Sequence, residues 1–196
     1  MSDKIKSLRR EIRSLEERLE NEFDRKRAAF QFRLENRRII FEKELVRQHR
    51  QLKRKLWRYI VGARPLIALT APFIYSLILA FVFLDLLVTI YQAVCFPIYG
   101  LKKVRRQDYI VLDRHHLAYL NGLEKLNCAY CSYGNGLIAY VGEIASRTES
   151  YWCPIKHARR MSGAHNRYHE FVEYGDAAGY QSKMRELTEG SHNTKT

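Results

Sequence analysis

The hydrophobic and polar positions divide the chain into three parts with different patterns. Residues 4–62 are rich in Glu, Arg, Lys and Leu, contain no Pro and have no Gly before Gly62, which predicts a long helix. From Pro65 to Gly100 the 36 residues are almost all apolar, and Asp85 is the only charged one. Residues 108–187 mix short apolar groups with polar residues, as a small soluble domain does. We therefore expect a mainly α-helical protein.

Large apolar residues in the N-terminal part recur at intervals of eleven residues, in two rows. The rows are Leu8, Leu19, Phe30, Phe41 and Leu52, and Ile12, Phe23, Leu34, Leu45 and Leu56. Eleven residues complete three turns of about 3.67 residues each, so the two rows would form a narrow, nearly straight stripe. A helix that lies on lipid normally has a wider apolar face. We therefore predict a self-associating coiled coil over residues 1–56, with a lipid-surface helix as the alternative.

The segment over residues 57–100 contains enough apolar residues to cross a membrane, since a spanning helix needs about 20. Thr70, Ala71 and Pro72 are typical of a helix start, and the next Pro is Pro97. The segment predicts either a single spanning helix or a re-entrant hairpin. The hairpin would bend near Pro65 to Pro72 or near Asp85.

Positive charge is concentrated beside this apolar segment, in a chain whose formal net charge is +13. Residues 1–24 carry six Lys or Arg and seven Asp or Glu, whereas residues 25–60 carry thirteen Lys or Arg and three Glu. Basic residues near a bilayer attract anionic lipid head groups, at about 1 kcal/mol each. The candidate lipid-binding residues on the two flanks are Lys53, Arg54, Lys55, Arg58, Arg64, Lys102, Lys103, Arg105 and Arg106.

The basic flanks also bear on topology. Lys and Arg mark the cytosolic side of membrane segments, and here they occur on both sides. This favours a hairpin with both ends in the cytoplasm over a single span. The first 60 residues are charged throughout and show no signal-peptide pattern, which also favours a cytoplasmic N-terminus. Nucleic-acid binding is a weaker expectation, because the basic excess lies beside the membrane segment.

Asp85 lies near the middle of the apolar segment, where a charged side chain costs about 2.5–3.5 kcal/mol on insertion scales. One interpretation is functional: the carboxylate faces an oligomer interior or a water-filled path, and a ring of such groups would attract cations. The other interpretation is a protonated Asp85 that is hydrogen-bonded to Thr89 or to a Tyr side chain. The sequence leaves both open.

Four residues of the C-terminal part have the spacing of a metal site. Cys128, Cys131, Cys153 and His157 form the pattern Cys-x2-Cys-x21-Cys-x3-His. A tight turn at residues 128–136 and a helix that begins at Cys153 would together supply a tetrahedral Cys3His set. We expect a structural zinc ion, with iron less favoured, in a domain over residues 101–187. Free thiols or a redox-active Cys128–Cys131 pair are the alternative.

The remaining elements of this domain follow from local pattern, and Cys95 in the apolar segment is expected to pack as a small apolar residue. We expect a strand at 109–112, helices over 116–126, over 137–151 and from Cys153, and helical residues over 166–187 with a break near Gly175 or Gly179. Residues 188–196 are polar and expected to be disordered.

Together these segments predict a homo-oligomeric integral membrane scaffold or adaptor whose zinc-bound cytoplasmic domain binds a protein partner. No arrangement of nucleophile, base and orienting group is evident in the sequence. One alternative is an enzyme at the membrane surface that uses Asp113, His115, His116 or His169. Another is a channel or transport subunit built around Asp85.

Overall fold

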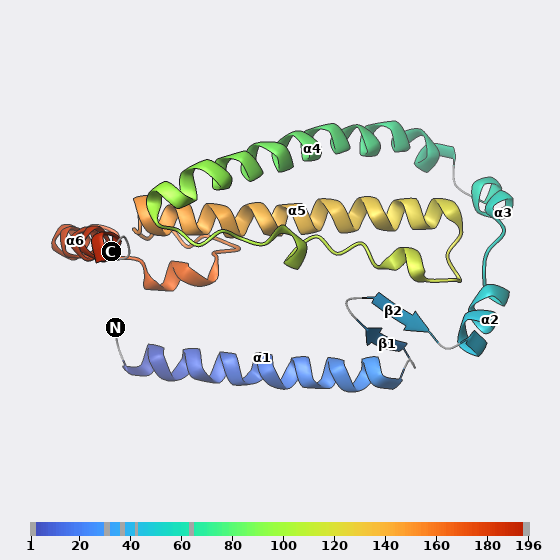
Figure 1. The fold of residues 1–196 in the computed structure, drawn as a ribbon, viewed down its shortest axis with the longest axis horizontal. Helices are drawn as coiled ribbons and strands as arrows, with labels where there is room; N and C mark the ends of the chain where they lie inside the picture. The colour runs from blue at the N-terminus through green and yellow to red at the C-terminus, as the bar shows by residue number, and fades with distance from the viewer. Residues whose placement is uncertain (1–2, 30–31, 36–37, 42, 63–64, 194–196) are drawn as a thin grey trace. The chain divides into compact units, whose positions relative to one another are not determined.

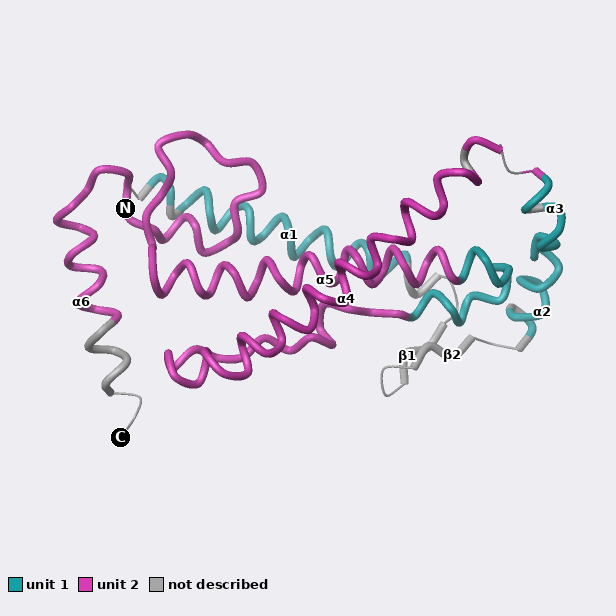
Figure 2. The backbone as a smooth tube through the Cα atoms, turned by 90° about the horizontal axis from the view of Figure 1, so that it is seen from above, with its two compact units in different colours: residues 1–61, 113–125 teal, residues 62–112, 126–196 magenta. Residues whose placement is uncertain are grey.

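The computed structural model describes residues 3–29, 32–35, 38–41, 43–62 and 65–193. It is mainly helical, as the sequence predicts (Figure 1). The chain divides into two compact units (Figure 2). The first contains residues 1–61 and 113–125, and the second contains residues 62–112 and 126–196. The apolar segment and most of the C-terminal part belong to the same unit.

The first unit contains several separate helices and strands in place of one continuous helix. Its elements are α1 (Asp3–Ala29), β1 (Phe32–Glu35), β2 (Arg38–Phe41), α2 (Lys43–Gln51), α3 (Leu56–Val61) and the 3-10 turn η2 (Arg114–His116). The strands form an antiparallel hairpin with Phe32 opposite Phe41. The expected helix over 4–62 is therefore wrong. β1 alternates apolar and charged residues with a period of two, and β2 is rich in Ile and Phe, which favours strands.

The break distributes the ten regularly spaced apolar residues over several elements. Those in α1 are Leu8, Ile12, Leu19 and Phe23, and all four are exposed. The later ones are Leu34 and Phe41 in the strands, Leu45 in α2, Leu52 after it and Leu56 in α3, while Phe30 lies outside the described residues. An eleven-residue stripe therefore cannot continue along one helix beyond α1.

In the second unit, two long helices lie side by side. Its elements are α4 (Pro65–Tyr99), the 3-10 turn η1 (Arg106–Asp108), α5 (Gly122–Trp152) from residue 126 onward, the 3-10 helix η3 (Asn166–Glu170) and α6 (Ala177–Asn193). α4 and α5 run in the same direction (Figure 1) and cross obliquely in the view of Figure 2. Their ring contacts follow in chain order, with centroids of Tyr75 and Tyr130 5.6 Å apart and those of Tyr99 and Tyr151 5.1 Å apart. α4 passes through Asp85 without a break, so the re-entrant hairpin is wrong.

α4 ends in a Schellman motif that reverses the direction of the chain. Gly100 has a φ of 71°, in the left-handed region. Its N–H donates to the carbonyl oxygen of Pro97 at 3.4 Å, and the N–H of Leu101 donates to that of Phe96 at 2.8 Å. Leu101 also packs with Phe96 in the core, the apolar contact that accompanies this motif. Residues 100–112 then return along the helix pair (Figure 1).

The core of this unit lies between α4, α5 and the returning segment, which we call the connection (residues 100–112). Its buried apolar residues are Phe96, Val104, Leu137, Tyr140 and Ile144. Each of the three elements supplies at least one of them, so the connection is part of the folded unit and not a loose loop.

α5 differs from the sequence-based expectation at its start. It is one continuous helix from Gly122, so the expected turn at 128–136 is wrong. The helix expected over 116–126 is present only from Gly122, and residues 109–112 form no strand. Asn121 caps the helix, because its Oδ1 accepts the N–H groups of Leu123 and Glu124 at 3.0 Å each. The helix expected over 137–151 is present as the second half of α5.

The chain beyond α5 is irregular before it becomes helical again. The helix expected from Cys153 is wrong, since Ile155 forms an isolated parallel bridge with Val172. η3 and α6 supply the helical residues expected over 166–187, and Gly175, with a φ of 88°, precedes α6 at the expected break. α6 continues to Asn193.

Candidate functional site

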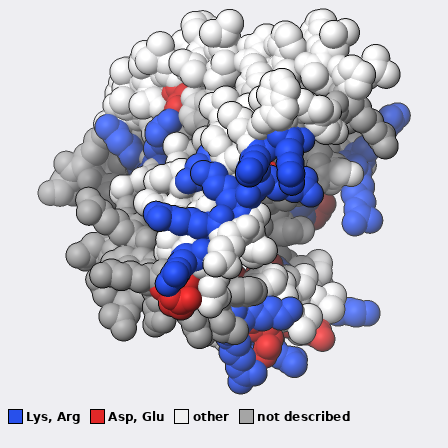
Figure 3. Space-filling model, turned by 90° about the vertical axis from the view of Figure 1, so that its right-hand side faces the viewer, with Lys and Arg blue, Asp and Glu red and all other residues white. Residues whose placement is uncertain are grey.

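α4 has one face packed on α5 and an opposite face that is exposed and apolar. The exposed large side chains are Leu66, Leu69, Phe73, Ile74, Leu77, Leu79, Val82, Phe83, Leu84, Leu86, Leu87, Ile90, Val94 and Ile98. Among the described exposed residues of α4 there is no Asp, Glu, Lys or Arg. Figure 3 shows the result as a broad uncharged surface over α4. The segment Ala68–Tyr99 is long and apolar enough to cross a membrane.

Two polar side chains of α4, Asp85 and Gln92, face inward, whereas Thr70, Ser76 and Thr89 are exposed. The Arg106 guanidinium donates to both carboxylate oxygens of Asp85, at 3.0 Å from Nε to Oδ1 and 2.6 Å from Nη2 to Oδ2. The Tyr133 hydroxyl donates to Oδ2 at 2.9 Å. Asp85 is only 13% exposed, so its charge is compensated within the chain. The hydrogen bond from a Tyr side chain agrees with one sequence-based interpretation of Asp85, but neither interpretation included a cation. Arg106, expected among the lipid-binding residues, instead forms an ion pair with Asp85.

Gln92 joins α4 to the connection. Its Oε1 accepts the N–H of Val104 at 3.0 Å, and its Nε2 donates to the carbonyl oxygen of Val104 at 3.3 Å and also contacts the Tyr140 hydroxyl. The amide therefore satisfies both backbone groups of Val104, as a strand partner would. The side chain is 6% exposed. Sequence reasoning missed Gln92; the signal available was a lone amide in an apolar helix, which needs a partner when buried.

Exposed cations lie on the connection and before α4. Lys102, Lys103 and Arg105 are exposed, and Arg105 donates to Asp108 at 2.8 Å. Exposed cations of the first unit that precede α4 in sequence are Lys53, Arg54, Lys55 and Arg58. Figure 3 shows Lys and Arg side chains gathered over α2 and α3. Arg64 lies outside the described residues.

The expected metal ligands do not fit a single ion. Cys128 and Cys131 lie within α5, and Cys153 follows its end. The 25 residues of helix from Cys128 to Cys153 span about 37 Å at 1.5 Å per residue. The backbone N–H of His157 donates to the Tyr168 hydroxyl at 2.6 Å. Within the described ranges, no three His, Cys, Asp or Glu residues form a group that could hold a metal ion.

The residues considered for catalysis do not form a recognised group either. Asp113, His115 and His116 belong to the first unit, at η2, whereas His169 belongs to η3 in the second unit. The rings of His115 and His116 lie 3.9 Å apart.

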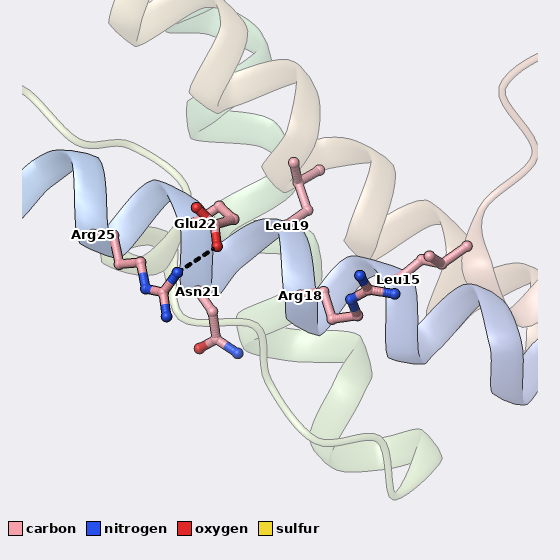
Figure 4. Close-up of a pocket in the computed structure, with 6 residues that line it drawn as sticks. All are labelled: Leu15, Arg18, Leu19, Asn21, Glu22 and Arg25. Atoms are coloured by element: carbon pink, nitrogen blue, oxygen red, sulfur yellow. Dashed lines mark hydrogen bonds and ion pairs between the residues drawn. The ribbon is translucent and has the colours of Figure 1, made fainter.

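A hollow beside α1 is lined by residues of that helix alone: Leu15, Arg18, Leu19, Asn21, Glu22 and Arg25 (Figure 4). Arg25 Nη1 donates to Glu22 Oε1 at 2.9 Å along the helix surface. A single helix cannot enclose a substrate, so we assign no chemistry to this hollow.

A second ion-pair network fixes the C-terminal segment on α5. Arg167 donates to both oxygens of Glu143, at 2.8 and 2.7 Å, and Arg147 Nε donates to Oε1 at 2.8 Å. The hydrogen bonds from Arg167, opposed by burial and reinforced by Arg147, lower the pKa of Glu143. Arg147 also donates to the carbonyl oxygen of Lys102, so the network reaches the connection.

Comparisons with protein-family models, with curated proteins and with solved structures find no match to this chain.

Proposed function

We propose that this protein is a membrane-bound helical scaffold that is anchored by α4 and self-associates through α1. The observation that supports the anchor is the exposed apolar face of α4, with fourteen large apolar side chains from Leu66 to Ile98. Burying one such side chain fully is worth about 1.5–3 kcal/mol. Even partial transfer of the whole face into lipid is therefore favourable by an amount on the order of 10 kcal/mol.

The anchor is tested by adding charge to the apolar face. In the full chain, Leu79→Glu with Phe83→Glu places two carboxylates on exposed positions one turn apart in α4. We expect this variant to move from the membrane pellet to the supernatant after alkaline carbonate extraction of cells. The matched control is Gln107→Glu with Ala139→Glu, at exposed positions outside α4, which should remain in the pellet. Retention of both variants, or release of the unmodified chain, contradicts the anchor.

Self-association is supported by the surface of α1. Its exposed apolar residues Ile5, Leu8, Ile12, Leu15 and Leu19 alternate at spacings of three and four. This is the heptad pattern of a coiled coil, and it replaces the eleven-residue pattern within α1. An exposed heptad stripe on a helix of 27 residues is completed by a second copy of the same helix.

The charges that flank this stripe favour an antiparallel pair. In a parallel dimer, Glu11 would face Glu16 of the second copy, a like-charge contact. In an antiparallel dimer with Leu8 opposite Leu19, Glu11 instead lies near Arg18 of the second copy, and this contact occurs twice. We therefore propose that two copies associate through antiparallel α1 helices. Zinc is not part of this proposal, because the expected ligands are separated along α5.

A further inference from the structure

We infer that α4 binds an anionic lipid bilayer while lying in the plane of its surface, with the connection and α5 on the aqueous side. This rests on the proposed membrane anchor and specifies its geometry. The apolar face of α4 would enter the boundary between head groups and acyl chains. Nothing in this arrangement requires the chain to cross the membrane.

The connection lies beside the middle of α4. The connection contacts α4 through Arg106 at Asp85 and through Val104 at Gln92. Arg106 is 46% exposed, and Arg105 is 67% exposed. If α4 crossed the bilayer, these cations would lie at the depth of its central turns, in hydrocarbon, where charged side chains are costly. With α4 in the surface plane, the same cations reach water and head groups.

α4 is longer than the hydrocarbon core of a bilayer requires. α4 has 35 residues, which is about 52 Å at 1.5 Å per residue. A hydrocarbon core of about 30 Å, crossed at a tilt of roughly 40°, accommodates about 26 residues. The exposed apolar face extends from Leu66 to Ile98, beyond that limit. A helix in the surface plane has no such restriction, because its whole length is at one depth.

Basic residues flank α4 on both sides in the sequence. Exposed cations precede it, from Lys53 to Arg58, and exposed cations follow it, at Lys102 and Lys103. The tendency of basic flanks to stay on the cytosolic side assigns both ends to one face of the membrane. An in-plane helix satisfies this without a hairpin, which α4 does not form. Anionic head groups are the partner that these cations complement.

The test measures the depth of spin labels in vesicles of phosphatidylcholine with phosphatidylserine. In a full-length chain with Cys95, Cys128, Cys131 and Cys153 replaced by Ala, single cysteines at Leu69, Phe83 and Val94 carry nitroxides along the exposed face. We expect all three labels to lie at the same shallow depth. Labels at Gln107 and Ala139, exposed on the connection and α5, should contact water-soluble relaxants.

A label at Phe83 that is much deeper than those at Leu69 and Val94 would overturn the inference while leaving the membrane anchor intact. Failure to bind vesicles at all would overturn the anchor itself. Labels shielded from both lipid and water would show that a second copy covers the face, which also overturns the inference. Polarised infrared spectra of the unmodified chain in oriented bilayers test the same geometry without substitutions. Helix axes parallel to the bilayer surface support the inference, and helix axes along the bilayer normal contradict it.

Discussion

Gly136 marks the closest approach between α5 and the connection. A Cβ atom at this position would lie 2.6 Å from the carbonyl oxygen of Tyr109 and 3.0 Å from the Cα of Ile110. Both are backbone atoms, which cannot move aside as a flexible side chain does. Gly142 lies on the same helix, and a Cβ there would meet nothing within 4 Å.

This contrast predicts opposite effects of two identical substitutions. Gly136→Ala should destabilise the protein by about 1–3 kcal/mol, because the connection must shift. Gly142→Ala should stabilise it by about 0.5–1 kcal/mol, since Ala restricts the unfolded chain and favours the helix. Denaturant unfolding of both variants measures the difference. Equal changes at the two positions would show that the close contact at Gly136 is not present in solution.

The network around Glu143 predicts a dependence of stability on pH. Because Arg167 and Arg147 lower the pKa of Glu143 from its ordinary value of 4.5, the folded state favours the ionised carboxylate. This contribution is fully present above about pH 4.5 and is lost as the pH falls through the lower, folded-state value. Glu143→Gln should therefore lose less unfolding free energy than the unmodified chain between about pH 5 and pH 3.

The measurement is the unfolding midpoint across this pH range, with Glu186→Gln as the control. Glu186 is 71% exposed on α6 and pairs with Lys183. Its variant should follow the unmodified chain. If the unfolding midpoint of Glu143→Gln changed with pH in parallel with that of the unmodified chain, the ion-pair network would not be the source of the pH dependence.

At the same scale, the sequence suggested Thr89 or a Tyr side chain as a partner of Asp85, but it suggested neither Arg106 nor which Tyr. Arg106 is 21 residues away and Tyr133 is 48 residues away, and only the reversal of the chain after Gly100 brings them to the carboxylate. Gln92 was missed for the same reason, since its partner Val104 lies beyond that reversal.

Among the elements, the apolar helix was the most predictable, because its whole length has one composition. α4 was expected from Pro72, and it begins earlier, at Pro65. The β-hairpin was missed because the eleven-residue spacing continues through it. The expected turn at 128–136 was wrong because two glycines there pack within a helix. Gly134 lies against the Phe81 ring, and tertiary contact of this kind offsets the helix penalty of about 1 kcal/mol for each Gly.

The antiparallel pairing of α1 predicts a pattern of cross-links between two copies of the full chain. In the background without native cysteines, a mixture of chains with Leu8→Cys and chains with Leu19→Cys should form disulfide-linked dimers that contain one of each. Either chain alone should cross-link weakly, because like positions lie at opposite ends of the pair. Efficient cross-linking of Leu8→Cys chains with each other would indicate a parallel dimer. Chains with Arg10→Cys, exposed on the opposite face of α1, are the control.

For the whole molecule, the cations of the connection should strengthen binding to anionic membranes. Each exposed Lys or Arg near the surface contributes about 1 kcal/mol, so replacing Lys102, Lys103 and Arg105 with Gln should weaken binding to phosphatidylserine-containing vesicles by up to about a hundredfold. Vesicle sedimentation measures the effect. Binding of the same variant to vesicles of phosphatidylcholine alone should be unchanged, since the apolar face of α4 is intact. An equal loss of binding to both kinds of vesicle would indicate that these cations stabilise the folded protein and do not contact anionic head groups.

The sequence by itself determined that the protein is mainly helical, that one long segment is apolar enough for a membrane, and that basic residues flank it. These properties depend on composition and on neighbours in the chain. The tertiary structure alone decided that α5 and the connection pack along one side of α4, that Asp85 is neutralised by Arg106, and that the expected zinc ligands are separated along one helix. Each of these depends on where a reversal at Gly100 and a continuous helix from Gly122 place residues that are distant in sequence.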